Sequence, residues 1–250
     1  MQDRRLPEKG VRNNPDIVNL DELTVADFGN VSEPDSPAGE ARTIAVMADA
    51  AKASELVIAL GGDNSITYAV GLGVFGDELA TAGLITLDAH HDLRDGISNG
   101  SPVRRLIQAG LDPKRIVQIG INDFSNSASY AQLASDLGIT VISREMVAEI
   151  GIKETCNIAL NVAGSAQGPI HVDLDVDVCD RSVVPACPAA APGGLSAFEL
   201  RQATRILASH ELVRGVDITE IDASKDSEDQ RTVRLAALLV LESAAGFQSR

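Results

Sequence analysis

Short apolar runs and stretches with helical apolar spacing alternate along most of the chain. The run LVIAL at Leu56–Leu60 ends at two glycines, which is typical of a buried strand. Further apolar runs predict strands at residues 84–87, 116–119, 140–142, 170–174 and 212–216. Helical spacing predicts helices over residues 40–54, 103–109, 128–137, 197–209 and 232–245. Strands that alternate with helices indicate an α/β fold with a mainly parallel sheet covered on both faces.

The N-terminal part of the chain does not share this pattern. Residues 1–38 are rich in Asp, Asn, Pro and Arg, and the stretch at 29–39 (GNVSEPDSPAG) is typical of a loop. Regular spacing begins at Glu40 and continues without an internal repeat. We therefore predict one domain over residues 1–250, with an irregular segment at 1–38.

Composition and charge narrow the classes of function. The 250 residues carry a formal net charge of −15, which disfavours nucleic-acid or anionic-membrane partners because both need basic patches. The first residues lack the apolar stretch of a signal peptide, and no run reaches the ~18 apolar residues of a membrane span. The three cysteines, Cys156, Cys179 and Cys187, form no CxxC pair. We expect a cytoplasmic protein whose cysteines stay reduced.

Polar clusters follow four of the predicted strands. They are GGDNS after Leu60, DAHHD after Leu87, an acidic ladder at the end of the strand at 170–174, and DITE after Val216. In open parallel sheets, ligands bind beyond the carboxyl ends of the strands. Segments far apart in the sequence are therefore expected to meet in one crevice.

The DAHHD cluster is the strongest local signal for a metal. Asp88, His90 and Asp92 alternate, so an extended segment would point all three side chains to one side. Two carboxylates and one imidazole suit Mn²⁺, and Mg²⁺ less well. Solvated acids with a capping histidine at a strand end are the alternative.

The acidic ladder is the second signal. Asp173, Asp175 and Asp177 alternate with apolar residues that must pack, and Asp180 follows. Carboxylates this close repel one another unless a cation or a proton compensates. A solvated surface ladder is the alternative. Together the two clusters offer enough oxygens for two ions that share carboxylates, an arrangement that activates water.

The other two clusters say less when taken alone. GGDNS is compatible with a tight turn and a helix cap, and it lacks the spacing and the lysine of a phosphate loop. Glu220 in DITE lies just beyond a predicted strand end. It could orient a cationic substrate, support a metal ligand or be a plain loop acid.

The four segments, in this order, resemble the ureohydrolases, the family of arginase, agmatinase, guanidinobutyrase and formimidoylglutamase. The family patterns are GGDHS, DAHxD, SxDxDxxDP followed by PGGL, and DxxExxP. Here they read GGDNS, DAHHD, DLDVDVCDR followed by PGGL, and DITEIDA, between about Leu56 and Asp222. The resemblance implies a three-layer α/β/α sandwich and a homo-oligomer, usually a trimer or hexamer.

By position, the resemblance also implies a site for two Mn²⁺ ions. The ligands of one ion would be Asn64, Asp88, Asp92 and Asp175. The ligands of the other would be Asp88, His90, Asp175 and Asp177. In such enzymes a metal-activated water attacks an amidine or guanidine carbon. Asp92 would hydrogen-bond this water, and Glu220 would pair with the cationic amidinium.

This sequence departs from the family in three places. Asn64 stands where the ligand is usually His; its carbonyl oxygen is a weaker donor than imidazole, so a single ion is an alternative. Asn99 stands where arginases and agmatinases carry a proton-shuttling His, and Asn cannot titrate. The family's first strand is not recognisable in residues 1–38.

The second departure points to a subgroup. The stretch SNGSPVR at Ser98–Arg104 resembles an SSGTPFR-like segment of formimidoylglutamases, and residues 120–127 resemble the same subgroup. The substrate favoured is N-formimidoyl-L-glutamate, which yields L-glutamate and formamide. Arg104 could fork onto one of its carboxylates, although a solvated helix start would also explain this arginine. Substrate contacts are expected from Asn99, Arg104, Asn126 and Glu220, and catalytic roles from Asp92, Asn99 and Glu220.

Two alternatives remain open on the sequence alone. The first is an agmatinase-like, guanidino-acid or arginase-type hydrolase that releases urea. The second is a catalytically inactive subunit with the ureohydrolase fold.

Overall fold

A computed structural model describes residues 19–250 of the chain. The part of the predicted irregular segment at residues 1–18 lies outside the described residues. Residues 19–36 contain one short 3-10 turn at Leu20–Glu22 and otherwise no helix or strand.

One sheet of six strands forms the centre of the fold, and every strand pair in it is parallel. The strands are β1 Val57–Leu60, β2 Gly83–Leu87, β3 Ile116–Ile121, β4 Thr140–Ser143, β5 Ile170–Asp175 and β6 Val213–Thr219. Their order across the sheet is β1-β6-β5-β2-β3-β4. The six predicted strands and the parallel sheet are confirmed.

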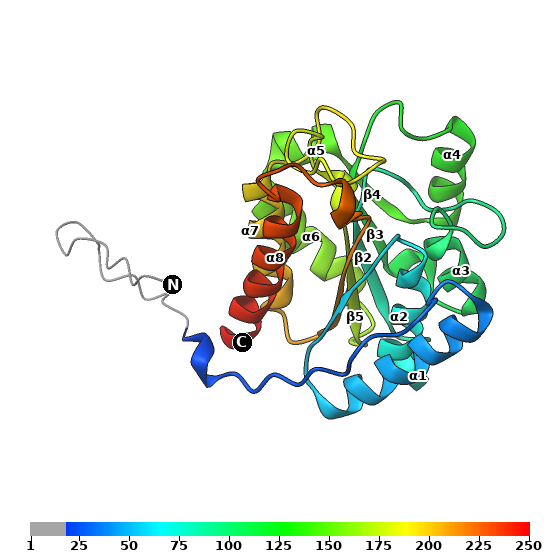
Figure 1. Cartoon of the computed structure of the whole chain (residues 1–250). Coiled ribbons are helices and arrows are strands. Elements are labelled where there is room, and N and C mark those ends of the chain that lie inside the picture. Colours follow the sequence, from blue (N-terminus) through cyan, green and yellow to red (C-terminus); the bar gives the residue numbers. More distant parts are fainter. Residues whose placement is uncertain (1–18) are drawn as a thin grey trace.

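Helices cover both faces of this sheet, as the sequence predicts (Figure 1). The helices are α1 Pro37–Ala53, α2 Ile66–Phe75, α3 Pro102–Ala109, α4 Ala128–Leu137, α5 Arg144–Ile150, α6 Ile152–Ala163, α7 Ala197–Ala208 and α8 Arg231–Gln248. The first four helices share one apolar core with the sheet, and the last four share another. The architecture is therefore a three-layer α/β/α sandwich.

Three helices were not predicted, each for a physical reason. The sequence of α2, ITYAVGLGVF, is apolar almost all round because the helix is buried, so no polar face gives it helical periodicity. The pair α5 and α6 is broken at Gly151, whose φ of 80° ends one helix and starts the next.

Helix α1 begins at Pro37, three residues before the predicted start, because the Ser36 side chain caps it by accepting from the Gly39 amide.

Strand β6 is longer than predicted. It runs to Thr219 and not to Val216, so Asp217 lies inside the sheet, in register with Asp173 of β5. Only Glu220 of the DITE cluster comes after the strand. The prediction that this whole cluster follows the strand is wrong, because Asp217, Ile218 and Thr219 are the last residues of β6 and Asp217 is buried.

The strand order places the four polar clusters together. The strands that precede them, β1, β6, β5 and β2, are four consecutive neighbours in the sheet and point the same way. Their carboxyl ends therefore form one continuous edge. None of the helices within residues 19–250 is long and apolar enough to cross a membrane.

Candidate metal centre

A buried group of three metal-ligand side chains lies at this edge. Atoms of Asp88, His90 and Asp177 that could bind a metal lie within 4.8 Å of one another. Nδ1 of His90 lies 2.8 Å from Asp177 Oδ2 and 3.5 Å from Asp88 Oδ1. Both carboxylates are buried, and they come from loops that follow different strands, β2 and β5. Two hard oxygen donors and one imidazole are a donor set that fits Mn²⁺.

Backbone hydrogen bonds lock these loops to one another. Asp88 Oδ1 accepts from the His90 amide at 2.7 Å, and Asp177 Oδ1 accepts from the Ala89 amide at 3.0 Å. The Asp177 amide in turn donates to Asp175 Oδ1 at 2.8 Å. Each carboxylate thus uses one oxygen to fold its own or a neighbouring loop. Among the described residues, the second oxygen of each carboxylate accepts no backbone hydrogen bond, and that of Asp177 contacts Nδ1 of His90.

The chain does not run extended through the DAHHD cluster. It bends directly after β2, and Asp92 has a φ of 52°, a conformation rare for residues other than glycine. The prediction that an extended segment aligns Asp88, His90 and Asp92 is therefore wrong in its geometry. The turn brings Asp88 and His90 to Asp177 and directs Asp92 to Asn64.

Like charge and burial dominate the electrostatics of the centre. Burial, and next the charge of Asp92, raises the pKa of Asp88 well above its usual range. Burial, and next Asp177, does the same to the pKa of Asp175. The pKa of Asp92 rises to about 7, again through burial first and Asp177 second. Such carboxyls must hold protons or a cation at neutral pH.

The pKa values of the two neighbouring histidines, His90 and His91, shift in opposite directions. Its hydrogen bond to Asp177 raises the pKa of the His90 imidazole. Burial lowers the pKa of His91, whose Nδ1 lies 2.7 Å from Gln118 Oε1. Gln118 also donates to the His91 carbonyl at 2.8 Å, so this residue pair braces the loop. His91 therefore stands outside the ligand group.

Asn64 reaches the centre with its amide nitrogen. Nδ2 donates to Asp92 Oδ2 at 2.6 Å. Its Oδ1 accepts from the hydroxyls of Thr67, at 2.8 Å, and Thr219, at 3.0 Å. Both hydroxyls can also accept, so the amide can turn over and present its oxygen to an ion. Neither threonine was predicted as a site residue, although Thr219 is part of the DITE cluster and Thr67 comes shortly after GGDNS.

Glu220 lies beside Asn64 at the same edge of the sheet. It is buried, and its Oε1 accepts from the backbone N–H of Asn64 at 2.9 Å and from the side-chain Nδ2 of Asn99 at 3.3 Å. Its φ of 63° places it, like Asp92, in a backbone region that costs energy. The structure thus brings the predicted residues Asn64, Asn99 and Glu220 together.

Two of the predicted substrate contacts have other partners. Arg104 donates to the Leu93 carbonyl at 3.1 Å and pairs with Asp95 at 2.6 Å. Asn126 accepts from the His91 amide at 3.0 Å and donates to the Ala89 carbonyl at 2.8 Å. In this arrangement both side chains hold the loops that carry the centre.

A second buried acidic group lies beneath the centre, inside the sheet. Asp173 and Asp217 are paired across β5 and β6, and both are completely buried. Burial, and next Asp217, raises the pKa of Asp173 well above its usual range. His171 Nε2 lies 3.0 Å from Asp217 Oδ2. This buried histidine contacts the carboxylate from inside the core.

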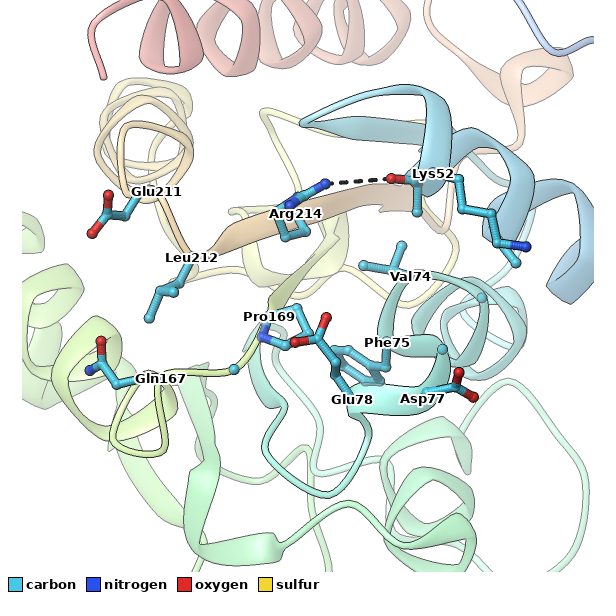
Figure 2. Close-up of a pocket in the computed structure, with 15 residues that line it drawn as sticks. Lys52, Val74, Phe75, Asp77, Glu78, Gln167, Pro169, Glu211, Leu212 and Arg214 are labelled. Carbon is cyan, nitrogen blue, oxygen red and sulfur yellow. Dashed lines mark hydrogen bonds between the residues drawn. The ribbon is translucent and has the colours of Figure 1, made fainter.

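A separate cavity of about 460 Å³ lies at the other end of the strands. Figure 2 shows Arg214 in its middle, with Pro169 and Leu212 from the turns that precede β5 and β6. Arg214 Nη2 donates to the Ser54 carbonyl at 3.1 Å, which closes the end of α1. None of the predicted site residues lines this cavity.

Comparisons with known proteins show which family this chain resembles. The family model described as Arginase family matches residues 2–246. The formimidoylglutamase of Bacillus subtilis (strain 168) is 36% identical over 194 residues, which are 76% of this chain and 60% of that protein. The guanidinopropionase of Pseudomonas aeruginosa is 34% identical over 181 residues, 70% of this chain and 55% of that protein. The chain thus spans about 60% of the length of the curated formimidoylglutamases it matches.

Solved structures give the same result at the level of the fold. The crystal structure of formimidoylglutamase from Bacillus subtilis subsp. subtilis str. 168 matches with a TM-score of 0.81 and 31% identity, over 88% of this chain and 70% of that one. A Trypanosoma cruzi formiminoglutamase, an asparagine-to-histidine variant with Mn²⁺, matches with a TM-score of 0.85 and 22% identity, over 93% and 78%. The family model covers nearly the whole chain, and the four motifs meet at one edge of the sheet. The chain belongs to the arginase family.

Proposed function

We propose that this chain is a Mn²⁺-dependent hydrolase of N-formimidoyl-L-glutamate. One water is consumed, the bond between the amidine carbon and the glutamate nitrogen breaks, and formamide and L-glutamate leave. The observation that carries the proposal is the buried group of Asp88, His90 and Asp177 at the edge where the four motifs meet. The similarity to formimidoylglutamases supports the choice of substrate.

Two Mn²⁺ ions are the proposed cofactor, and the donor set fits them. Asp88 and Asp175 would be shared, with Asp92 and Asn64 on one side and His90 and Asp177 on the other. The buried carboxyls Asp88, Asp92 and Asp175 have raised pKa values and like-charged neighbours, which is the condition that a divalent cation relieves. Asn64 leaves one ion as the alternative, because a neutral amide is the weakest donor of the set.

The residues of this chain divide the remaining work. A bound divalent ion supplies a water of lowered pKa. Asp92 would accept a hydrogen bond from that water, and Glu220 would pair with the amidinium of the substrate. Asn99 contacts Glu220 and cannot titrate, so it orients the substrate side and shuttles no proton. Both acids adopt positive φ angles, a strain that active sites commonly hold.

Hydrolysis of a guanidine is a second candidate, favoured by the 34% identity to a guanidinopropionase. It would use the same metal centre and release urea. An inactive subunit stays the third possibility, with Mn²⁺ bound and no amidine or guanidine turned over. A cytoplasmic location and a homo-oligomer, trimeric or hexameric, stay predictions.

The test is hydrolysis by metal-stripped protein reloaded with Mn²⁺. N-formimidoyl-L-glutamate, agmatine and arginine are supplied in parallel, and formamide and urea are measured. Formamide release that is lost in Asp175→Ala and kept in Asp49→Ala, on the exposed face of α1, supports the proposal. Urea release transfers the assignment to guanidines. No turnover, with Mn²⁺ still bound, overturns it in favour of the inactive subunit.

A further inference from the structure

The proposed substrate has one cationic end and two carboxylates, so the site needs a positive charge opposite Glu220. Arg104 was the predicted partner of a carboxylate, but its guanidinium already serves Leu93 and Asp95. Only 30% of the Arg104 side chain is exposed. Arg104 is thus bound on two sides by its own loop, whereas a second arginine of the same loop is better placed to meet the substrate.

Arg94 is the other arginine of this loop. It is exposed, and within residues 19–250 its side chain forms no ion pair, in contrast to Arg104 and Arg105. Its own backbone amide donates to the Gly100 carbonyl at 3.0 Å, which closes the loop between them. The backbone at Arg94 is therefore fixed, and no carboxylate of the described residues 19–250 pairs with its guanidinium.

Gly100 sets the direction of this side chain. A Cβ built on Gly100 would lie 2.7 Å from Cδ of Arg94 and 2.9 Å from its Nε. The arginine thus lies flat along the backbone of Gly100, a path that only the absence of a side chain permits. The next residue back, Asn99, donates to Glu220. Arg94 accordingly lies along the same loop that reaches the site.

Arg94 is also close to the centre along the chain, because it lies two residues after Asp92. The centre itself is lined with acids, so this cation is the complement that an anionic substrate tail requires. Fork-shaped guanidinium groups match carboxylates in a bidentate way.

We propose that Arg94, held along Gly100, binds a carboxylate of the substrate and selects amidines with an anionic tail. This rests on the proposed function and adds the residue that determines its specificity. Arg94→Ala raises KM for N-formimidoyl-L-glutamate roughly tenfold to a hundredfold with little change in kcat. Arg94→Lys restores part of the loss, because charge returns without the fork. Gly100→Ala reproduces part of it, because the flexible Arg94 side chain must move aside.

The decisive comparison uses N-butylformamidine, which has the reacting group and no carboxylate. Its kcat/KM is expected to be the same in Arg94→Ala and in the parent protein. Arg234→Ala, an exposed arginine on α8, is the matched control and changes neither substrate. Equal losses on both amidines, or an unchanged KM for the anionic one, would overturn the assignment.

A binding measurement separates this inference from the proposed function. L-glutamate is titrated calorimetrically into Mn²⁺-loaded parent protein and into Arg94→Ala, and Mn²⁺ affinity is measured for both. Binding that weakens tenfold or more in the variant, with Mn²⁺ affinity unchanged, supports the role of Arg94 even if no amidine is hydrolysed. Equal glutamate affinity, or none in the parent protein, refutes it.

Discussion

The side-chain amide of Asn64 donates to Asp92 across a distance of 2.6 Å, and this links the loop after β1 to the loop after β2. The two residues were predicted to share a metal ion, and here they share a hydrogen bond. Asn64 is itself held by the hydroxyls of Thr67 and Thr219. The neutral amide thus occupies a position at which a stronger donor could reach the same carboxylate and the same ion.

Replacing Asn64 by His should strengthen Mn²⁺ binding. Imidazole is a better donor than an amide oxygen, so we expect about tenfold higher affinity at one ion and a full second equivalent of metal. Metal content and calorimetric titration measure both quantities. Asn64→Ala should lower the affinity. A second ion bound equally in all three proteins would show that residue 64 contributes no ligand.

Replacing Asp175 by Asn should stabilise the metal-free protein while abolishing its response to Mn²⁺. Burial, and next Asp177, raises the pKa of Asp175, so the folded metal-free protein must hold a proton there that the unfolded chain releases. Asn removes this requirement. We expect a gain on the order of 1–3 kcal/mol in the free energy of unfolding near neutral pH. Denaturant titrations with and without Mn²⁺ test this. A loss of stability in the metal-free variant would contradict it.

The stability of metal-free protein should fall as pH rises from about 4 to about 7. The folded protein holds the proton of Asp92 up to a pKa of about 7, whereas the unfolded chain releases it near 3.8. Between these values the folded state binds more protons, so the free energy of unfolding decreases with pH. For this carboxyl the whole effect is roughly 4 kcal/mol. Asp88 and Asp175 act in the same direction.

Mn²⁺ should reverse this trend, because metal ligands bind in their deprotonated form. The gap in Tm between loaded and metal-free protein is expected to widen from about pH 5 to about pH 8. Differential scanning calorimetry across this range gives the gap directly. The Asp175→Asn variant provides the control, and a gap independent of pH would argue against protons in the empty centre.

Glu40→Ala should destabilise the fold and leave the site intact. Glu40 holds Arg105 through two bonds of 2.6 and 2.9 Å, and the guanidinium stacks 3.7 Å from the centre of the Tyr68 ring. Removing the acid leaves a mostly buried cation without a partner, at a cost of about 2–3 kcal/mol. Adding Arg105→Met should recover part of this. An unchanged kcat/KM of Glu40→Ala at low temperature would show that the Glu40–Arg105 ion pair contributes to stability and not to catalysis.

The sequence predicted the sheet well because buried strands carry a continuous apolar pattern. It failed for α2, where a helix buried on all sides has no polar face to show. It also placed Asp217 beyond a strand end, since no local pattern reveals a charged residue paired inside the sheet with His171.

The motif residues could be predicted, but their partners could not. Asp88, His90 and Asp177 meet because four strands are neighbours in the sheet, a relationship that lies between distant segments. The choice between Arg94 and Arg104 as the substrate-binding residue depends on which guanidinium already binds groups of its own loop, as Arg104 binds Leu93 and Asp95. Hydrogen-bond competition of this kind is not written in the spacing of the residues.

The position of β1 gives the site one movable wall. This strand has four residues, pairs in the sheet only with β6, and ends at Leu60, which is 70% exposed, whereas β2, β5 and β6 are interior strands. Fraying of β1 would withdraw Asn64 from Asp92 and Glu220 while the other proposed ligands stay in place. Metal exchange would then proceed through a local opening, and the amides of β1 should exchange with deuterium before those of β5. A metal ion bound at Asn64 would oppose this local opening of β1.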